Sequence, residues 1–197
     1  MARQPHTGNA DAALMHAPGK ETQAMRKPGD PVPEVTFRLR RDGVWLEKTS
    51  EDLFKGRAVV VFAVPAAFST ACSARHLPGY VALAKNIKAM GIDEIFCVAV
   101  NDAFVMNAWA RDQGIDGEVS LLPDGNGEFA RSMGMLEDRS DLGFGRRSRR
   151  YAMIVRDGII DALFAEDPRR GADAFEVSDA ITLLDFLDHQ SPRAVAE

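Results

Sequence analysis

One of the two cysteines in the chain stands where a reactive thiol would be expected. The run Ala58–Val64 is apolar and rich in valine, Pro65 follows it, and a helical pattern opens near Thr70. Cys72 therefore falls in the first turn of a helix, where free N–H groups and the positive end of the helix dipole favour a thiolate. This is also the carboxyl edge of the predicted sheet, where α/β proteins place their sites. The alternative is a small buried apolar side chain, the commonest role of a free cysteine.

The other side chains that could do chemistry do not group in the sequence. Cys72 and Cys97 form no C-x-x-C pair, which argues against a dithiol centre or a zinc knuckle. The four histidines are scattered, so no metal site and no cofactor are expected. His76 follows Cys72 by four residues and shares its helix face, but the pair of a Cys/His hydrolase normally comes from distant segments. We interpret His76 as a polar packing residue with a role near the pocket entrance.

Composition narrows the class of protein. The chain has 197 residues, 46% of them hydrophobic and 27% charged, which fits one folded domain with tails. Its formal net charge is −5, so nucleic acid is not an expected partner, and a solvated turn explains Arg146 and Arg147 in the basic cluster Arg146–Arg150. The longest apolar stretch, Ala58–Phe68, is far shorter than the ~20 residues of a membrane span. No export signal is recognisable, so the cytoplasm is the expected compartment.

Periodicity and turn signals predict the elements that position Cys72. Strands are expected over 35–39, 44–47, 58–64, 94–100, 119–122, 151–155 and 159–164, and helices over 51–54, 70–90, 102–113 and 128–133. Asp42-Gly43 and Asp157-Gly158 predict β-hairpins, and Pro78-Gly79 predicts a kink or break in its helix. Thr49 or Ser50 caps the first helix, and Ser178 caps a closing helix with an apolar face. That face consists of Ile181, Leu184 and Leu187.

This order of elements indicates a three-layer α/β domain with a mixed central sheet and an N-terminal β-hairpin. The strand–helix–strand unit around Cys72 requires a parallel pair with a right-handed crossover. We expect a disordered leader over residues 1–29, the folded domain over 30–189 and a C-terminal tail over 190–197.

The segment around Cys72 resembles the signature of the peroxiredoxins. Pro65-x-x-x-Ser69-x-x-Cys72 matches a proline, a threonine or serine, and the peroxidatic cysteine at the family's spacing. Four further segments are similar to the atypical type II, or type-five, branch, and most to the peroxiredoxin half of bacterial peroxiredoxin–glutaredoxin hybrids. They are Ser73–Gly79, Val100–Trp109, Leu122–Phe129 and Leu142–Met153. The resemblance covers about Val32 to Leu187 and implies a thioredoxin-like fold.

The resemblance implies a thiol-dependent peroxidase that reduces hydrogen peroxide and alkyl hydroperoxides. Cys72 would be the nucleophile, Ser69 would hydrogen-bond the peroxide, Pro65 would shield the thiolate, and Arg150 would stabilise it and hold the peroxide oxygens. Arg111 falls where the family carries a second, supporting arginine; a solvated helix residue is the alternative. Arg149 would have a supporting role at most.

The resemblance also bears on regeneration and assembly. In some type II members a cysteine at the position of Cys97 is assigned as resolving, although its predicted strand is buried and a direct bridge to Cys72 needs Cα atoms within about 7 Å. The alternatives are a plain core cysteine and an external reductant, either glutathione with glutaredoxin or thioredoxin. A homodimer through loops near the site is implied.

Departures from the family's loop keep a second hypothesis open. Ala66 and Thr70 replace the usual glycine and proline, and Ala66 then requires a negative φ. Ser69 keeps the hydroxyl of the usual threonine but loses the methyl group that restricts its rotamer. The second hypothesis is a slow or non-catalytic thioredoxin-like module that senses oxidants or binds partners.

Overall fold

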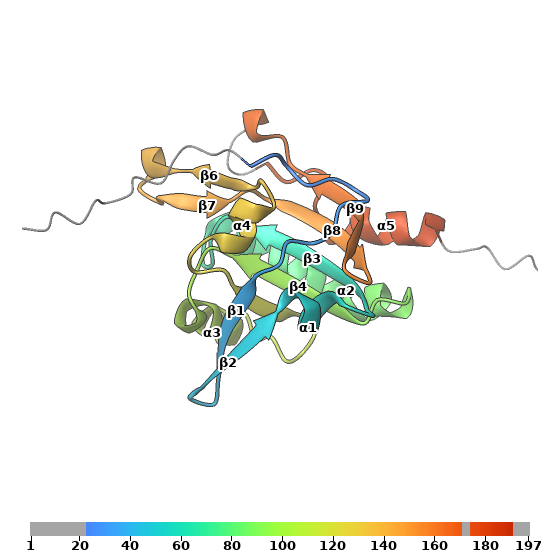
Figure 1. The fold of residues 1–197 in the computed structure, drawn as a ribbon, viewed down its shortest axis with the longest axis horizontal. Coiled ribbons are helices and arrows are strands. Elements are labelled where there is room, and N and C mark those ends of the chain that lie inside the picture. Colours follow the sequence, from blue (N-terminus) through green and yellow to red (C-terminus); the bar gives the residue numbers. More distant parts are fainter. Residues whose placement is uncertain (1–22, 171–173, 191–197) are drawn as a thin grey trace, which may run out of the picture.

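A five-stranded mixed sheet forms the centre of the computed structural model, which describes residues 23–170 and 174–190 (Figure 1). In spatial order its strands are β5 (Ser120–Pro123), β4 (Glu94–Ala99), β3 (Ala58–Val64), β8 (Tyr151–Arg156) and β9 (Ile159–Ala165). β3, β4 and β5 are parallel, whereas β8 runs antiparallel to β3 and forms a hairpin with β9. The predicted parallel pair around Cys72 is therefore confirmed.

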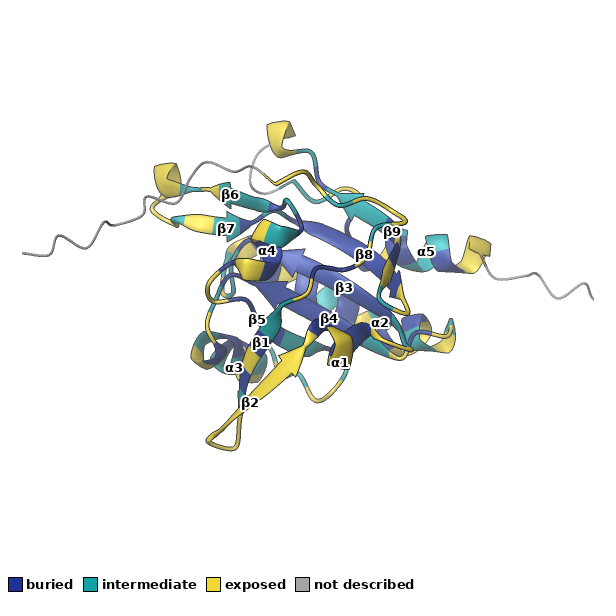
Figure 2. Cartoon of the chain, in the orientation of Figure 1, coloured by how far each residue is buried: buried dark blue, intermediate teal, exposed yellow. Residues whose placement is uncertain are grey.

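Two hydrophobic cores lie on opposite faces of this sheet (Figure 2). Residues of α2 (Leu77–Ala89), α3 (Ala103–Asp112) and α5 (Ala180–Gln190) pack into one core, and residues of α1 (Ser50–Phe54), α4 (Glu128–Ser132) and β1 (Thr36–Arg41) into the other. β1 forms a hairpin with β2 (Val44–Thr49), which is exposed. Successive side chains of β3 alternate between the two cores, because strand side chains point to opposite faces. The structure confirms the predicted three-layer, thioredoxin-like α/β fold. No helix in the described part of the chain is long and apolar enough to cross a bilayer.

Both predicted hairpin turns and the predicted cap of the first helix are present in the structure. Asp42 and Gly43 have φ values of 48° and 80°, and Asp157 and Gly158 have 50° and 79°. Positive φ at both central residues is what a type I′ hairpin turn requires. Thr49 caps α1 in a capping box, in which its side chain accepts from the backbone N–H of Asp52.

The helix after Cys72 differs from the prediction at its start. It does not break at Pro78-Gly79; instead a π-helical turn, Cys72–His76, precedes an uninterrupted α2. In the π-turn, the N–H of Leu77 donates to the carbonyl of Cys72, five residues back. Proline has no N–H to donate and its ring crowds the carbonyl four residues earlier, so the wider turn before Pro78 relieves a conflict that a regular α-turn would create.

The closing helix also differs from the prediction. Its cap is Asp179, whose carboxylate accepts from the backbone N–H groups of Ile181 and Thr182, whereas the Ser178 hydroxyl donates to Glu166. The buried face of α5 therefore consists of Ala180, Leu183 and Leu187, and Ile181 is 63% exposed. Leu187 is buried as predicted and Leu184 is half-buried against the same core, so the predicted face is wrong at Ile181.

Two features near the N-terminus and the basic cluster were not predicted. Residues 24–32, most of them expected in the disordered leader, bond to the domain: Arg26 N–H donates to the Met133 carbonyl, and Gly29 N–H to the Ile160 carbonyl. Residues 1–22 of that leader, and residues 191–197 of the expected tail, lie outside the described residues. The short strands β6 (Leu136–Asp138) and β7 (Arg146–Ser148) pair where only a turn was expected, and the single turns Ser140–Leu142 and Pro168–Arg170 are 3₁₀-helical.

Candidate active site

Cys72 is held at the junction between β3 and the π-turn. Pro65 follows β3 and is buried, and the N–H of Ala67 donates to Oδ1 of Asn101 at 3.0 Å, which ties the loop to the end of β4. Phe68 in this loop has φ 62°, a sparsely populated conformation for a bulky residue, and is 51% exposed. Ala66 is not among the residues with positive φ, as its side chain requires.

Arg150 meets the sulfur directly. Because β8 is antiparallel to β3, with Tyr151 opposite Ala63, the start of β8 lies beside the end of β3. Arg150 Nη1 lies 3.4 Å from Cys72 Sγ, and the two residues are only 3% and 0% exposed. Arg150 Nε is buried and has no hydrogen-bond partner among the described residues. The arrangement combines a thiol, a fixed positive charge and a spare N–H donor in a site shielded from water.

His76 is a buried neighbour of Arg150, not a residue at a pocket entrance. Its Nδ1 lies 3.0 Å from Arg150 Nη1, and its Nε2 lies 3.0 Å from the carbonyl oxygen of Ser178. Because a carbonyl can only accept, Nε2 carries the hydrogen and Nδ1 accepts from Arg150. Burial, and next the charge of Arg150, lower the pKa of His76 to about 3, so its imidazole is neutral at physiological pH.

Cys97 lies in the same core as Cys72 but points to no opening. It is 0% exposed on β4, opposite Phe62 of β3. Burial, and next the neighbouring Cys72, raise the pKa of Cys97 well above its ordinary value. Both cysteines are free thiols. As a protonated thiol inside a central strand, Cys97 is a poor nucleophile in this conformation.

Pro65 and Ser69 both lie in the segment between β3 and the π-turn. The half-buried Ser69 hydroxyl donates to the Ala66 carbonyl at 3.0 Å, which leaves its oxygen lone pairs free to accept. A hollow of about 10 Å³, enough for about one water, opens beside Pro65 and Arg150, and charged residues line most of the rest of its wall. A larger hollow of about 590 Å³ between Pro31 and Phe54 contains none of the predicted site residues.

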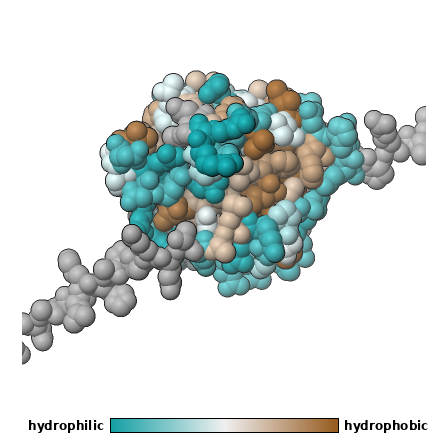
Figure 3. Space-filling model, turned by 90° about the horizontal axis from the view of Figure 1, so that it is seen from above, coloured by the Kyte–Doolittle hydropathy of each residue, from teal (hydrophilic) through white to brown (hydrophobic). Residues whose placement is uncertain are grey.

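Charged groups surround the small hollow on the upper side of the molecule. Arg139 forms an ion pair with Glu137 at 2.8 Å, and Arg149 Nη2 donates to the Glu166 carbonyl at 2.8 Å. Figure 3 looks onto this side and shows hydrophobic side chains in patches among hydrophilic ones. The small hollow beside Arg150 is therefore lined mainly by charged side chains.

Two other arginines lie differently from what the sequence indicated. Arg111 is exposed in the last turn of α3, as its solvated alternative requires, and no hydrogen bond joins its side chain to the described site. Arg147, interpreted as a solvated turn residue, is half-buried on β7, and its Nη1 donates to the Val100 carbonyl at 2.7 Å. Within the basic cluster, Arg146 is the exposed residue.

Sequence reasoning missed Glu166 and assigned Ser178 only to a helix end. Glu166 follows β9, and its carboxylate accepts from the Ser178 backbone and hydroxyl. A carboxylate directly after the apolar end of β9, Ala162–Ala165, was the available signal. No group of three or more metal-ligating side chains gathers in the portion of the chain that the structure describes.

Together, the fold and this geometry define a thiol-based oxidoreductase of the thioredoxin-like class. The family model described as Redoxin matches residues 27–184. A hybrid peroxiredoxin, hyPrx5, of Haemophilus influenzae is 46% identical over 170 residues, covering 85% of this chain and 70% of its own. Peroxiredoxin sll1621 of Synechocystis is 48% identical over 179 residues, covering 84% of this chain and 94% of its own.

A solved structure shows the same likeness in three dimensions. Reduced Prx3 of Vibrio vulnificus, in complex with hydrogen peroxide, has a TM-score of 0.77 and 41% identity, covering 83% of this chain and 99% of its own. The chain belongs to the redoxin family and is a peroxiredoxin similar to the type-five branch. It is accordingly an oxidoreductase with thiol-dependent peroxidase activity, and the hypothesis of a non-catalytic module is set aside.

Proposed function

We propose that the chain reduces hydrogen peroxide and alkyl hydroperoxides through Cys72 as its peroxidatic cysteine. The observation that carries this proposal is the contact of 3.4 Å between Arg150 Nη1 and Cys72 Sγ, next to an Arg150 Nε that has no partner among the described residues. A buried donor left without an acceptor costs about 1–3 kcal/mol, so an oxygen atom of a bound peroxide would relieve that cost. The charge on the same guanidinium favours the thiolate over the thiol.

The reaction forms one S–O bond and breaks one O–O bond. The Cys72 thiolate attacks the terminal oxygen of the hydroperoxide, and the second oxygen leaves with the electron pair of the O–O bond. The leaving oxygen takes up a proton and departs as water or an alcohol. The sulfur is thereby oxidised to sulfenic acid while the peroxide is reduced.

The other residues of the motif have complementary roles in this proposal. Arg150 stabilises the negative charge that develops on the leaving oxygen, because its N–H donors are fixed before the reaction begins. Ser69 accepts the O–H of the hydroperoxide, since its own hydrogen is engaged by the Ala66 carbonyl. Pro65 keeps water away from the sulfur and forms one wall of the small hollow.

An external thiol regenerates Cys72 in this proposal. The burial and raised pKa of Cys97 argue against rapid formation of a Cys72–Cys97 disulfide, because the strand would have to move. One thiol condenses with the sulfenic acid to give a mixed disulfide and water, and a second thiol releases Cys72 as a thiol. Glutathione with glutaredoxin, or thioredoxin, supplies these thiols, in keeping with a reducing cytoplasm.

We also propose a homodimer that forms through loops near the site. The exposed aromatic ring of Phe68, one residue before Ser69, supports such a contact because a strained, exposed aromatic residue is poorly accounted for in a monomer. Sedimentation of the reduced protein tests this, and a monomer at every concentration contradicts it.

Replacement of the nucleophile tests the function itself. Cys72→Ser keeps the side-chain volume nearly unchanged, so the variant is expected to fold but to consume no peroxide. Peroxide consumption by a folded Cys72→Ser protein contradicts the assignment. Turnover of the wild type with glutathione and glutaredoxin, compared with thioredoxin and its reductase, identifies the reductant.

A further inference from the structure

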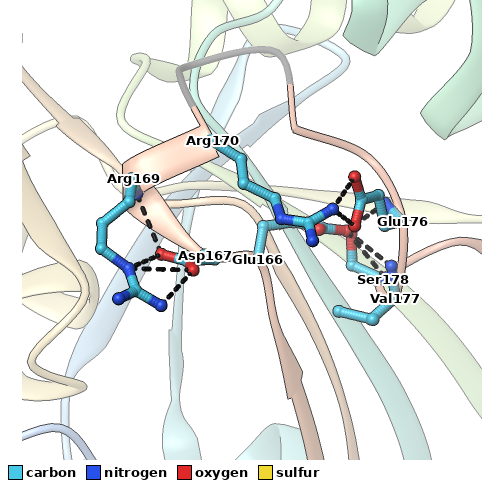
Figure 4. A network of polar contacts seen from close by, with 7 residues as sticks. All are labelled: Glu166, Asp167, Arg169, Arg170, Glu176, Val177 and Ser178. Atoms are coloured by element: carbon cyan, nitrogen blue, oxygen red, sulfur yellow. Dashed lines mark hydrogen bonds and ion pairs between the residues drawn. The ribbon is translucent and has the colours of Figure 1, made fainter.

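Glu166 gathers the segment that follows β9 around one carboxylate (Figure 4). Its Oε1 accepts from the backbone N–H groups of Glu176 at 2.9 Å, Val177 at 3.0 Å and Ser178 at 2.9 Å. The Ser178 hydroxyl donates to the same oxygen at 2.7 Å. Glu166 itself is only 6% exposed, so this charged group is buried against backbone donors and not against water.

The segment that Glu166 holds contacts the active site through the Ser178 carbonyl and the Phe175 ring. The Ser178 oxygen accepts from His76 Nε2 at 3.0 Å and from the Tyr80 hydroxyl at 3.0 Å. It thereby places the hydrogen of the imidazole on Nε2 and leaves Nδ1 to accept from Arg150. The same segment also carries Phe175, whose ring lies 4.8 Å from that of His76 and 5.7 Å from the Arg150 guanidinium carbon.

Glu166 is tied to Arg150 through its main chain as well. The Glu166 N–H donates to the Arg150 carbonyl at 3.1 Å, and the Glu166 carbonyl accepts from the Arg149 side chain at 2.8 Å. Glu166 thus fixes both ends of Arg150: its backbone directly, and its guanidinium through Ser178 and His76.

We propose that Glu166 is a positioning residue for the peroxidase reaction, acting through Ser178 and His76 on the guanidinium of Arg150. The inference rests on the proposed function, in which Arg150 serves Cys72. This arrangement has a physical advantage over a direct Glu166–Arg150 ion pair, because a neutral group accepts the hydrogen bond from Arg150. A carboxylate directly on Arg150 would offset the positive charge that favours the thiolate, whereas a neutral imidazole orients the guanidinium and leaves that charge available. The Glu166 carboxylate does not contact the Arg150 guanidinium, and backbone N–H groups of the segment after β9 stabilise its negative charge.

Glu166→Gln is the variant that tests this role, because it removes the charge and keeps the shape. The measurement is the second-order rate constant for reaction of reduced, folded protein with hydrogen peroxide, together with the thermal midpoint. We expect a loss of about 10-fold in rate, the lower end of what outer partners of a functional group typically contribute. Asp161→Asn is the matched control, since this carboxylate lies in β9, the strand that Glu166 follows, but pairs with Arg156 on the surface. It is expected to react at the wild-type rate.

A double-mutant cycle separates positioning from plain structural support. If Glu166 acts through His76, Glu166→Gln adds little to the rate loss of His76→Ala, because the contact of His76 with Arg150 is already lost in that variant. Additive losses, or a Glu166→Gln protein that reacts as fast as the wild type, overturn the inference. In that case the Cys72 assignment still stands, provided that the wild type consumes peroxide and Cys72→Ser does not.

The tautomer of His76 can be measured on the wild-type protein, so this test does not depend on the folding of a variant. Nitrogen NMR of the reduced protein at neutral pH reports which ring nitrogen of His76 carries the hydrogen. The proposal requires hydrogen on Nε2 and a bare Nδ1. Hydrogen on Nδ1 overturns it, because that nitrogen could not then accept from Arg150.

Discussion

The protonation of His76 gives the protein a specific dependence of stability on pH. In the native state burial and Arg150 hold the pKa of His76 at about 3, while in the unfolded chain it returns to about 6.5. Below about pH 6.5, His76 therefore binds a proton in the unfolded chain but stays neutral in the native protein. The free energy of unfolding must fall as the pH falls from about 6.5 toward 3, and this contribution is fully present only above about pH 6.5.

The size of the effect follows from these two pKa values. Each pKa unit corresponds to about 1.36 kcal/mol, so the whole difference amounts to about 5 kcal/mol. About 2 kcal/mol of this is lost between about pH 7.5 and about pH 5. Burial raises the pKa of Asp124 to about 6, within the same range, so comparison with a His76 variant is needed to isolate the contribution of His76. His76→Gln removes the titration and keeps one donor and one acceptor on the side chain.

Urea unfolding of the reduced wild type and of His76→Gln, at several pH values in this range, checks the prediction. The stability advantage of the wild type is expected to shrink by about 2 kcal/mol as the pH falls, because all other titrating groups are common to both proteins. A difference between the two proteins that stays constant with pH would refute the reasoning. It would mean that His76 has the same pKa in the native protein as in the unfolded chain, as an imidazole in contact with water would have.

Three further predictions concern the reaction of Cys72; the first two are measured by formation of sulfenic acid in rapid mixing and the third by turnover. Arg150→Met should slow the reaction by about 100- to 1,000-fold, and Arg150→Lys should recover part of the loss. The control Arg146→Met, at an exposed position of β7, should react at the wild-type rate, and a large loss in this control alone would assign the role to another arginine. Ser69→Ala should slow the reaction and Ser69→Thr should preserve or raise the rate, and equal rates in all three proteins would exclude the hydroxyl from the site. Cys97→Ala should keep most of its turnover with glutathione and glutaredoxin; a complete loss, with a Cys72–Cys97 disulfide in the oxidised wild type, would make Cys97 the resolving cysteine.

Much of the fold could be predicted because its signals are local and repeated. The solid apolar runs of β3 and β4, and the Asp-Gly pairs of both hairpins, each specify one structure at short range. The cap of α5 could not be predicted, because Ser178 and Asp179 are both good capping residues. A carboxylate twelve positions away decides between them by engaging the Ser178 hydroxyl.

The site likewise has a part that local sequence specifies and a part that depends on long-range contacts. Cys72, Ser69 and Pro65 lie in one short motif, so their proximity is local, and the antiparallel placement of β8 brings Arg150 beside them. The environment of His76 depends on a carbonyl 102 positions along the chain, and no sequence pattern specifies that contact. For this reason the sequence indicated a polar packing residue at His76 but not its buried, neutral form or its contact with Arg150.

The π-turn makes the number of residues between Cys72 and Tyr80 as important as their identity. A π-turn holds one residue more than an α-turn, so one further residue inserted between Cys72 and Tyr80 would swing Cys72 by about 100° away from the buried face on which Tyr80 lies, and deletion of one residue would restore the regular α-turn with which Pro78 conflicts. A substitution at the exposed Ala74 leaves this spacing unchanged. Across evolution, and in any mutant library, we expect this stretch to drift in composition but to keep its length, so that gaps in an alignment should fall elsewhere.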